Sequence, residues 1–499
     1  MQRFFLRAIA SITLLTALAL FHPQIQAQSS TPTGAPADQQ TTVYLPMLLA
    51  AGAPNPAPPP PPPPPAGAGF FTLTDYLTYN AATAIDAQGV VHLAFYASDE
   101  RHGDEPLGQP AFYTSCAAGA AACGDPQHWS SLVQIDSAVN EVQIAVTSDG
   151  RPRLLIRVNG SRGYDYYYWG CEGQCANADR WAGAQVTNAA GVELRNAEMP
   201  QHSFALDSQN RPRFVYGNGW GNGRTHGIYY AFCDAPDCTD PAGWQESLLE
   251  TMQNKTLSAD YTALVFDADQ PRFVTRATVS GLPDRVVYFA CNQSCDDPAS
   301  WASTTLQHPQ GRQWANWDLA LDSTGTPQIA LYDAPAPDIF VGGKLYYGWC
   351  EASCAASDAP FQIVQVASGE GMNVDLAIDV QGRTHMVYDA GQRGTLGELW
   401  CDTNCTNPGA WQRRILETSN QVMQEFAPAS PFTCDQQERA WFDAIPSVAF
   451  SPAGQLVVAY DIKNVATCYD TDPTDPSRPP STRVERIWWG VRWASFARQ

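Results

Sequence analysis

Four aspartates are candidates for catalysis because they fall at predicted strand ends or in the adjoining loops: Asp318, Asp375, Asp389 and Asp443. Two carboxyl groups that meet in one site can act as acid and as nucleophile or base at a glycosidic bond. A separation of ~5.5 Å favours retention of configuration, and ~6.5 to 9.5 Å favours inversion. The pairs considered are Asp318 with Asp375 and Asp389 with Asp443. The alternative is structural, since an aspartate that ends a strand is often a turn residue.

A second set of residues combines aromatic rings with charged groups. Rings can stack on sugar faces while charged groups bond hydroxyls, so the set predicts a carbohydrate-binding site. Its members are Arg157, Trp220, His226, Arg276, Trp317, Tyr332, Tyr388, Arg439, Tyr460 and Asp461. Packing between neighbouring sheets is the alternative for Tyr332 and Tyr388. Several of these positions differ from one repeat to the next, which favours one asymmetric site.

No sharper catalytic motif accompanies these residues. The sequence contains no H-E-x-x-H, no P-loop and no G-x-S-x-G. The run DTDPTD from Asp470 resembles half of a calcium loop, but it lacks the glycine and the closing glutamate, and a flexible acidic loop is the better interpretation. We therefore expect no cofactor and no metal, and the sequence leaves open whether the protein is an enzyme.

The elements that position these residues are predicted from a sequence motif that occurs seven times. The motif consists of an apolar residue, an Asp or its substitute, a turn, and then an apolar run. The copies start at Ala84, Ala145, Ala205, Val265, Ala320, Ala377 and Ala449, between 55 and 72 residues apart. Each copy continues through an aromatic strand, a cysteine pair and another strand, which makes four short strands, A to D. The pattern predicts a seven-bladed β-propeller over residues 70–499, with a β-solenoid as the rival.

The two ends of the repeat region complement each other. The last copy stops after its third strand, IWWGVRW from Ile487, while GFFTLTD from Gly69 precedes the first copy. We expect this N-terminal strand to complete the last blade and close the ring.

The fourteen cysteines are expected to form seven disulfides. Six pairs recur between strands C and D: Cys116–Cys123, Cys171–Cys175, Cys233–Cys238, Cys291–Cys295, Cys350–Cys354 and Cys401–Cys405. A metal site is the second choice, because zinc needs four ligands and these pairs belong to separate blades. Cys434 and Cys468 break the pattern, and we predict that they join two long loops, 419–446 and 461–485, into a flap.

The N-terminal region predicts export. Residues 1–27 resemble a signal peptide, with Arg3 and Arg7 before a short apolar stretch and Ala27 at the expected cleavage site. Residues 28–69 form a Pro-rich linker with eight consecutive prolines, and its segment VYLPMLL is either a docking element or a merely sticky patch. Without the signal the net charge is about −23, which argues against nucleic acid and anionic membrane. We expect a secreted or cell-surface monomer with no membrane span.

The Asp-and-Gly turns of a secreted propeller resemble the Asp boxes, or BNR repeats, of the sialidase-like superfamily. An Asp box reads Ser-x-Asp-x-Gly-x-x-Trp, whereas LDSTGTPQI from Leu321 has one extra residue before Gly and no Trp. The resemblance implies a polysaccharide or glycoconjugate ligand, glycoside hydrolase chemistry if the protein is an enzyme, and three arginines for a substrate carboxylate, for which Arg157, Arg276 and Arg312 are candidates. A non-catalytic, lectin-like or protein-binding propeller is the alternative.

Overall fold

The computed structural model describes most of residues 69–496. The described ranges are 69–73, 77–98, 109–160, 163–186, 202–218, 225–251, 262–277, 285–334, 343–389, 395–421, 433–442, 446–469 and 483–496. The predicted signal peptide, almost all of the linker, Trp220 and Asp443 lie outside these residues and stay predictions. Within the described ranges, no helix has the length and apolar character needed to cross a membrane.

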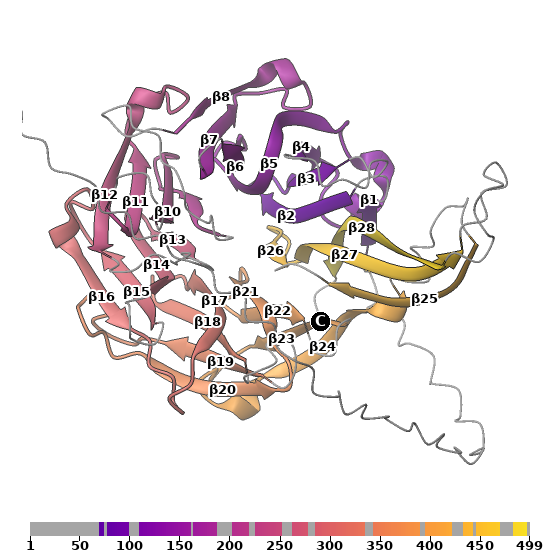
Figure 1. The fold of residues 1–499 in the computed structure, drawn as a ribbon. Helices are drawn as coiled ribbons and strands as arrows, with labels where there is room; N and C mark the ends of the chain where they lie inside the picture. The colour runs from indigo at the N-terminus through magenta and orange to yellow at the C-terminus, as the bar shows by residue number, and fades with distance from the viewer. Residues whose placement is uncertain are drawn as a thin grey trace, which may run out of the picture. The chain divides into compact units, whose positions relative to one another are not determined.

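Seven antiparallel blades form the fold, as the repeat predicts, and Figure 1 shows them in sequence order around a ring. Strand β5 is long enough to be the outer strand of the first blade and the inner strand of the second, which joins these two blades into one sheet.

The strands of each blade follow one another from the axis of the ring to its rim. In this order, the first four blades are β2 (Leu77–Ile85), β3 (Val91–Ser98), β4 (Gln109–Cys116) and β5 (Val133–Val146); β5, β6 (Pro152–Gly160), β7 (Gly163–Cys171) and β8 (Trp181–Gln185); β9 (Phe204–Leu206), β10 (Pro212–Asn218), β11 (Gly227–Cys233) and β12 (Trp244–Thr251); and β13 (Ala263–Asp267), β14 (Gln270–Ala277), β15 (Arg285–Cys291) and β16 (Trp301–Thr305). The last three are β17 (Trp314–Leu321), β18 (Pro327–Asp333), β19 (Lys344–Trp349) and β20 (Gln362–Ser368); β21 (Met372–Ile378), β22 (Thr384–Asp389), β23 (Thr395–Cys401) and β24 (Gln412–Thr418); and β26 (Ser447–Phe450), β27 (Leu456–Tyr469), β28 (Arg483–Phe496) and β1 (Gly69–Leu73).

The seventh blade combines both ends of the described chain. Strand β1 pairs antiparallel with β28, with Gly69 opposite Ser495 and Leu73 opposite Val491. The N-terminal strand thus lies in the same sheet as the last three blade strands of the sequence.

The seventh blade also differs from the sequence prediction. The sequence predicts a loop over 461–485, but β27 continues to Tyr469 and β28 starts at Arg483, and β25 (Thr433–Phe442) pairs with the extension of β27. Figure 1 shows these yellow strands reaching beyond the ring. Strand structure thus extends into both ends of the expected loop, and residues 461–469 are β-branched or aromatic about as often as polar. Cys434 lies opposite Cys468 in the register, and their disulfide stays a prediction.

The core lies between the blades. Every described residue of the middle strands β18 and β22 is buried, because each blade is covered on both faces by its neighbours. Seven apolar clusters of buried residues, each combining residues of adjacent strands or blades, fill this space.

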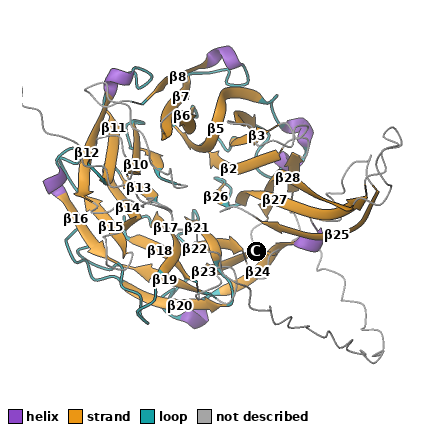
Figure 2. Cartoon of the chain, viewed as in Figure 1, coloured by secondary structure: helices purple, strands orange, loops and turns teal. Residues whose placement is uncertain are grey.

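One end of the blades carries the same structure repeatedly. The six predicted local disulfides are present, with Cα–Cα distances of 5.6 to 5.9 Å. In five of these blades the indole of the next tryptophan donates a hydrogen bond to the carbonyl of the second cysteine; the donors are Trp129, Trp181, Trp244, Trp301 and Trp411. One-turn 3₁₀ helices precede these tryptophans and appear in purple at the rim in Figure 2.

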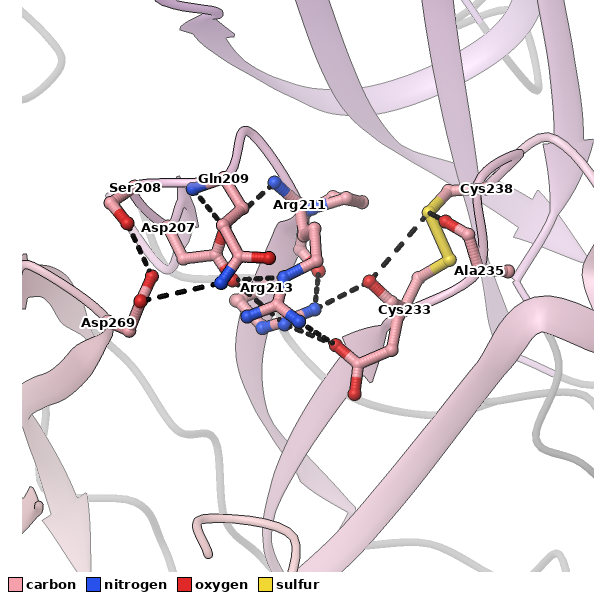
Figure 3. A network of polar contacts seen from close by, with 11 residues as sticks. Asp207, Ser208, Gln209, Arg211, Arg213, Cys233, Ala235, Cys238 and Asp269 are labelled. Carbon is pink, nitrogen blue, oxygen red and sulfur yellow. Dashed lines mark hydrogen bonds and ion pairs between the residues drawn. A yellow bond between two sulfur atoms is a disulfide. The ribbon is translucent and has the colours of Figure 1, made fainter. Parts of the chain in front are cut away.

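Buried arginines bond cysteine carbonyls at this end of the blades, and one of them, Arg213, also pairs with the aspartate of its inner turn. Arg213 donates to the carbonyl of Cys233 at 2.6 Å and pairs with Asp207 at 2.9 Å and Asp234 at 2.5 Å (Figure 3). Arg153 and Arg272 make the same bond to the carbonyls of Cys171 and Cys291. This end of the ring is therefore a repeated scaffold whose charges are satisfied within each blade.

Candidate functional site

A cavity of about 230 Å³ lies on the axis of the ring. Each blade contributes part of its innermost strand or a residue just ahead of it: Asn80, Gln143, His202, Leu264, Asp318, Asp375 and Ser447 are among the lining residues. The strands are related by the repeat, but the side chains that they present to the cavity are not. A single asymmetric site thus lies on the axis of a sevenfold scaffold.

Hydrogen bonds between neighbouring blades orient several of these side chains. Four side chains accept a main-chain N–H from the next blade: Gln143 from Phe204 (2.8 Å), Asp318 from Leu376 (2.7 Å), Asp375 from Val448 (2.6 Å) and Ser447 from Thr83 (2.9 Å). The four acceptors stand at one position of the repeat, four residues before the inner turn. Asp318 and Asp375 therefore stabilise the ring, whatever else they do.

His202 reaches the two aspartates from the other side of the cavity. Its Nδ1 lies 3.3 Å from Oδ1 of Asp318, and its Nε2 lies 3.6 Å from Oδ2 of Asp375. The aspartates are nearly buried, with side chains 5% and 4% exposed, whereas the histidine is 31% exposed. His202 precedes β9 with φ of 65°, a left-handed conformation that is uncommon outside glycine.

The three groups determine one another's charge. Burial by itself would lower the pKa of His202, but the carboxylates of Asp375 and Asp318 outweigh burial and raise that pKa to about 9. Burial would raise the pKa of Asp318, yet the adjacent histidine holds it below its usual value. Burial raises the pKa of Asp375 well above its usual value, the nearby Asp318 adds to this rise, and His202 opposes it. The two aspartates thus differ in proton affinity because their surroundings differ.

The predicted pair Asp318 and Asp375 is brought together by the fold. One ligand atom from each of His202, Asp318 and Asp375 lies within 4.8 Å of the others. The other predicted pair stays a prediction, because Asp443 is outside the described residues. Asp389 ends β22 and is 5% exposed.

The aromatic candidates lie inside the blades. Trp317, Tyr332, Tyr388 and Tyr460 are at most 2% exposed. The hydroxyl of Tyr460 donates to Glu417, which also pairs with Arg492 at 2.6 Å. Tyr332 and Tyr388 belong to one apolar cluster of the fifth and sixth blades, which favours the packing alternative, and ligand binding by these rings stays a prediction.

The charged candidates are distributed around several blades. Arg157 pairs with Glu141 at 3.3 Å, and the guanidinium of Arg276 lies over the ring of Trp317 at 5.7 Å. Asp461 accepts the N–H of Asn80 at 2.5 Å, a contact between the seventh and first blades. His226 is half-buried just before β11, and Arg439 lies in β25.

Arg312 completes the arginines that the family resemblance implied. It pairs with Asp333 at 3.3 Å, and Asp333 also contacts His308 at 3.1 Å. Arg157, Arg276 and Arg312 thus have different partners in different blades, and none of the three lines the axial cavity.

His202 is the residue of this site that the sequence motifs did not single out. A signal was present, because the other six repeats carry Ala81, Val142, Thr262, Trp317, Val374 and Pro446 at its position. A histidine at a position that is otherwise apolar or small is a departure from the repeat, and such departures are where the sequence predicts a ligand site.

Fold and cavity together define a class of protein: a disulfide-rich, seven-bladed propeller with one asymmetric polar site on its axis. No protein-family model matches the chain, and no curated protein matches it.

Several solved structures are similar to the chain at low identity. A protein of unknown function from Dyadobacter fermentans has a TM-score of 0.44 and 11% identity, covering 87% of this chain and 100% of that one. An alpha-L-arabinofuranosidase of Fusarium graminearum, in complex with arabinobiose, has a TM-score of 0.42 and 7% identity, covering 85% and 97%. The NanB sialidase of Streptococcus pneumoniae has a TM-score of 0.39 and 11% identity, covering 85% and 69%. A sialidase is thus among the solved structures to which the chain is similar.

Proposed function

We propose that the protein is a glycan-binding propeller that takes its ligand at the axial cavity. The observation that carries the proposal is the convergence of His202, Asp318 and Asp375 from three blades in a cavity that all seven blades line. A concave site with a few oriented polar groups is the usual form of a small-molecule site. At about 230 Å³ the cavity suits a single sugar residue of a larger glycan, since drug-sized ligands need about 300 Å³ or more.

Charge supports a ligand rich in hydroxyl groups. The two carboxylates are acceptors for hydroxyl donors, and the imidazole of His202 is a donor beside them. A protein with a net charge of −21 and two aspartates at the site would repel a polyanion such as nucleic acid.

Cleavage is the second candidate function, and one observation favours it. One carboxylate oxygen of Asp318 lies within 4.8 Å of one of Asp375, so the two carboxyl groups are close enough to act on a single glycosidic bond. In that case one carboxyl group would attack the sugar and the other would protonate the leaving oxygen. The hydrogen bond that each aspartate accepts from the next blade favours binding over this role, because it commits one oxygen of each carboxylate to the scaffold.

A glycan array with the purified protein tests binding, and a reducing-end assay on each positive glycan tests cleavage. Asp318→Asn and Asp375→Asn keep the oxygen that accepts the main-chain N–H but remove the charge. We expect either variant to lose at least 10-fold in glycan affinity, and at least about 10³-fold in turnover if cleavage occurs. Asp322→Asn is the matched control, because Asp322 also accepts main-chain N–H groups in the fifth blade but stands at its inner turn.

If the wild-type protein neither binds a glycan on the array nor releases reducing ends, the proposal is contradicted. Binding that is unchanged in both axial variants would place the glycan elsewhere on the molecule. Circular dichroism of each variant, compared with that of Asp322→Asn, shows whether the fold is kept.

A further inference from the structure

His202, Asp318 and Asp375 are the only group of three or more metal-ligating side chains that converge in the part of the chain described by the structure. They come from the third, fifth and sixth blades, so the group exists only once the ring has closed. One ligand atom from each of the three side chains lies within 4.8 Å of the other two, and the two imidazole nitrogens approach separate carboxylates, at 3.3 and 3.6 Å.

We propose that these three side chains bind a divalent transition-metal cation, of the class of Zn²⁺ or Mn²⁺, on the axis of the propeller. One imidazole nitrogen and two carboxylates form a mixed nitrogen and oxygen ligand set, which suits these ions better than the all-oxygen set preferred by Ca²⁺. The imidazole would bind through one of its two nitrogens, and His202, whose side chain is 31% exposed, is the least buried of the three groups.

Main-chain N–H groups orient the two carboxylates, as hydrogen-bond donors around the ligands do in known metal sites. The N–H of Leu376 donates to Asp318 at 2.7 Å, and the N–H of Val448 donates to Asp375 at 2.6 Å. Main-chain donors on neighbouring strands move little, so the carboxylates are oriented before any cation arrives. Hydrogen bonds of this kind fix the direction of ligand oxygens in metal sites.

Burial and charge point to the same occupant. Two carboxylates with 5% and 4% exposure lie side by side, an arrangement that is unfavourable unless a positive charge compensates it. His202, whose pKa the two carboxylates raise, supplies one positive charge when no metal is bound, and a divalent cation balances both carboxylates. Asn316, which projects from the same face of β17 as Asp318, is 2% exposed, and its Oδ1 has no hydrogen-bond partner among the described residues.

A cation with three protein ligands keeps a coordination position open, as catalytic zinc sites do. The open position would face the axial cavity, where hydroxyl oxygens of a sugar are suitable ligands. The link to glycans rests on the proposed function, whereas the cation site itself does not. A bound cation also uses both carboxylates as ligands, which excludes their use as nucleophile and acid.

Isothermal titration calorimetry tests the cation site without any glycan. The purified full chain is treated with EDTA, dialysed, and titrated separately with ZnCl₂, MnCl₂ and CaCl₂. We expect one equivalent of Zn²⁺ or Mn²⁺ per chain, with at least 10-fold weaker binding in Asp318→Asn, Asp375→Asn and His202→Asn. Asparagine is chosen at position 202 because it tolerates the left-handed backbone there.

Asp322→Asn, at the inner turn of the fifth blade, is expected to bind as the wild type does. The absence of saturable Zn²⁺ and Mn²⁺ binding in the wild type, or equal binding in the three axial variants, would overturn the site. Co²⁺ provides a second readout, since its visible absorption in the wild type must disappear in the His202→Asn variant even if that variant is less stable.

The glycan array, repeated with EDTA and with added Zn²⁺ or Mn²⁺, separates this proposal from the proposed function. Metal binding without binding to any glycan on the array supports the cation site and contradicts glycan binding. Glycan binding that survives EDTA, in a protein that binds no metal, overturns the cation site and leaves the proposed function in place.

Discussion

Two regions of this propeller differ in how strictly they follow the repeat: the repeated layer, which is the disulfide end of the blades, and the axial layer, which is the set of side chains that line the cavity. At the disulfide end, local disulfides occur in six blades, and the tryptophan and arginine bonds to their cysteines recur in several of them. On the axis, the innermost strands present Gln143, Asp318, Asp375 and Ser447 at one repeat position, and His202 is the one histidine at the preceding position. The repeated layer builds the ring, and the layer that departs from the repeat has the composition of a binding site.

This contrast predicts that variants in the repeated layer cost stability, whereas variants on the axis cost ligand binding. The largest loss of stability is expected for Arg213→Met. This change leaves Asp207, whose side chain is 1% exposed, without one of its two arginines and removes a hydrogen bond to the carbonyl of Cys233. We expect the free energy of unfolding to fall by about 3 kcal/mol, measured by urea denaturation.

Arg211→Met is the matched control for this effect. Arg211 pairs with the same Asp207 at 2.7 Å, but its side chain is 30% exposed, so solvent screens the interaction. A loss of at most about 1 kcal/mol is expected. Equal losses in the two variants would contradict a role for burial in the repeated layer.

A smaller effect, dependent on pH, is expected at Asp379. Burial would raise the pKa of this carboxyl, but the N–H groups of Arg383 and Gln381 and the guanidinium of Arg383 lower it. Because the folded pKa is depressed, the stabilisation is fully present above the unfolded pKa of about 3.9 and is lost as the pH falls through the folded pKa. Asp379→Asn should therefore be less stable by about 1 to 2 kcal/mol at pH 7, and the difference should shrink below about pH 4.

Urea denaturation of the wild type and of Asp379→Asn between pH 7 and pH 3 measures this difference. A stability gap that stays constant over the whole range would show that the charge of Asp379 is not its source.

The smallest change in stability is expected for Asp375→Asn, on the axis. Its amide oxygen still accepts the N–H of Val448, and the change removes a charge that lies beside Asp318. We expect the free energy of unfolding to stay within about 1 kcal/mol of the wild type. A loss as large as that of Arg213→Met would make Asp375 a scaffold residue and remove the contrast between the two layers.

The sequence predicts the layer that repeats better than the layer that departs from the repeat. Four strands per unit, the six local disulfides and the position of Asp318 and Asp375 follow from periodicity, because equivalent residues must occupy equivalent places in a ring. The extensions of β27 and β28 do not follow from it, since they belong to no repeat.

His202 escapes prediction for a different physical reason. Its partners are 116 and 173 residues away, and closure of the ring, not local spacing, brings them within reach. Tyr332 and Tyr388 are the opposite case, since the sequence singled them out and the structure shows them buried. An aromatic residue near a strand end has the same sequence pattern whether it faces a ligand or the core.

The most direct test of glycan binding at the axial cavity is the glycan affinity of His202→Asn, measured beside its free energy of unfolding. The substitution removes the one side chain that departs from all other repeats at its position, and asparagine suits the backbone there. We expect glycan affinity to fall at least 10-fold in a variant that stays folded under the assay conditions, because the imidazole donor at the cavity is lost. Unchanged glycan affinity, or a loss of affinity that only follows unfolding, would contradict glycan binding at this cavity.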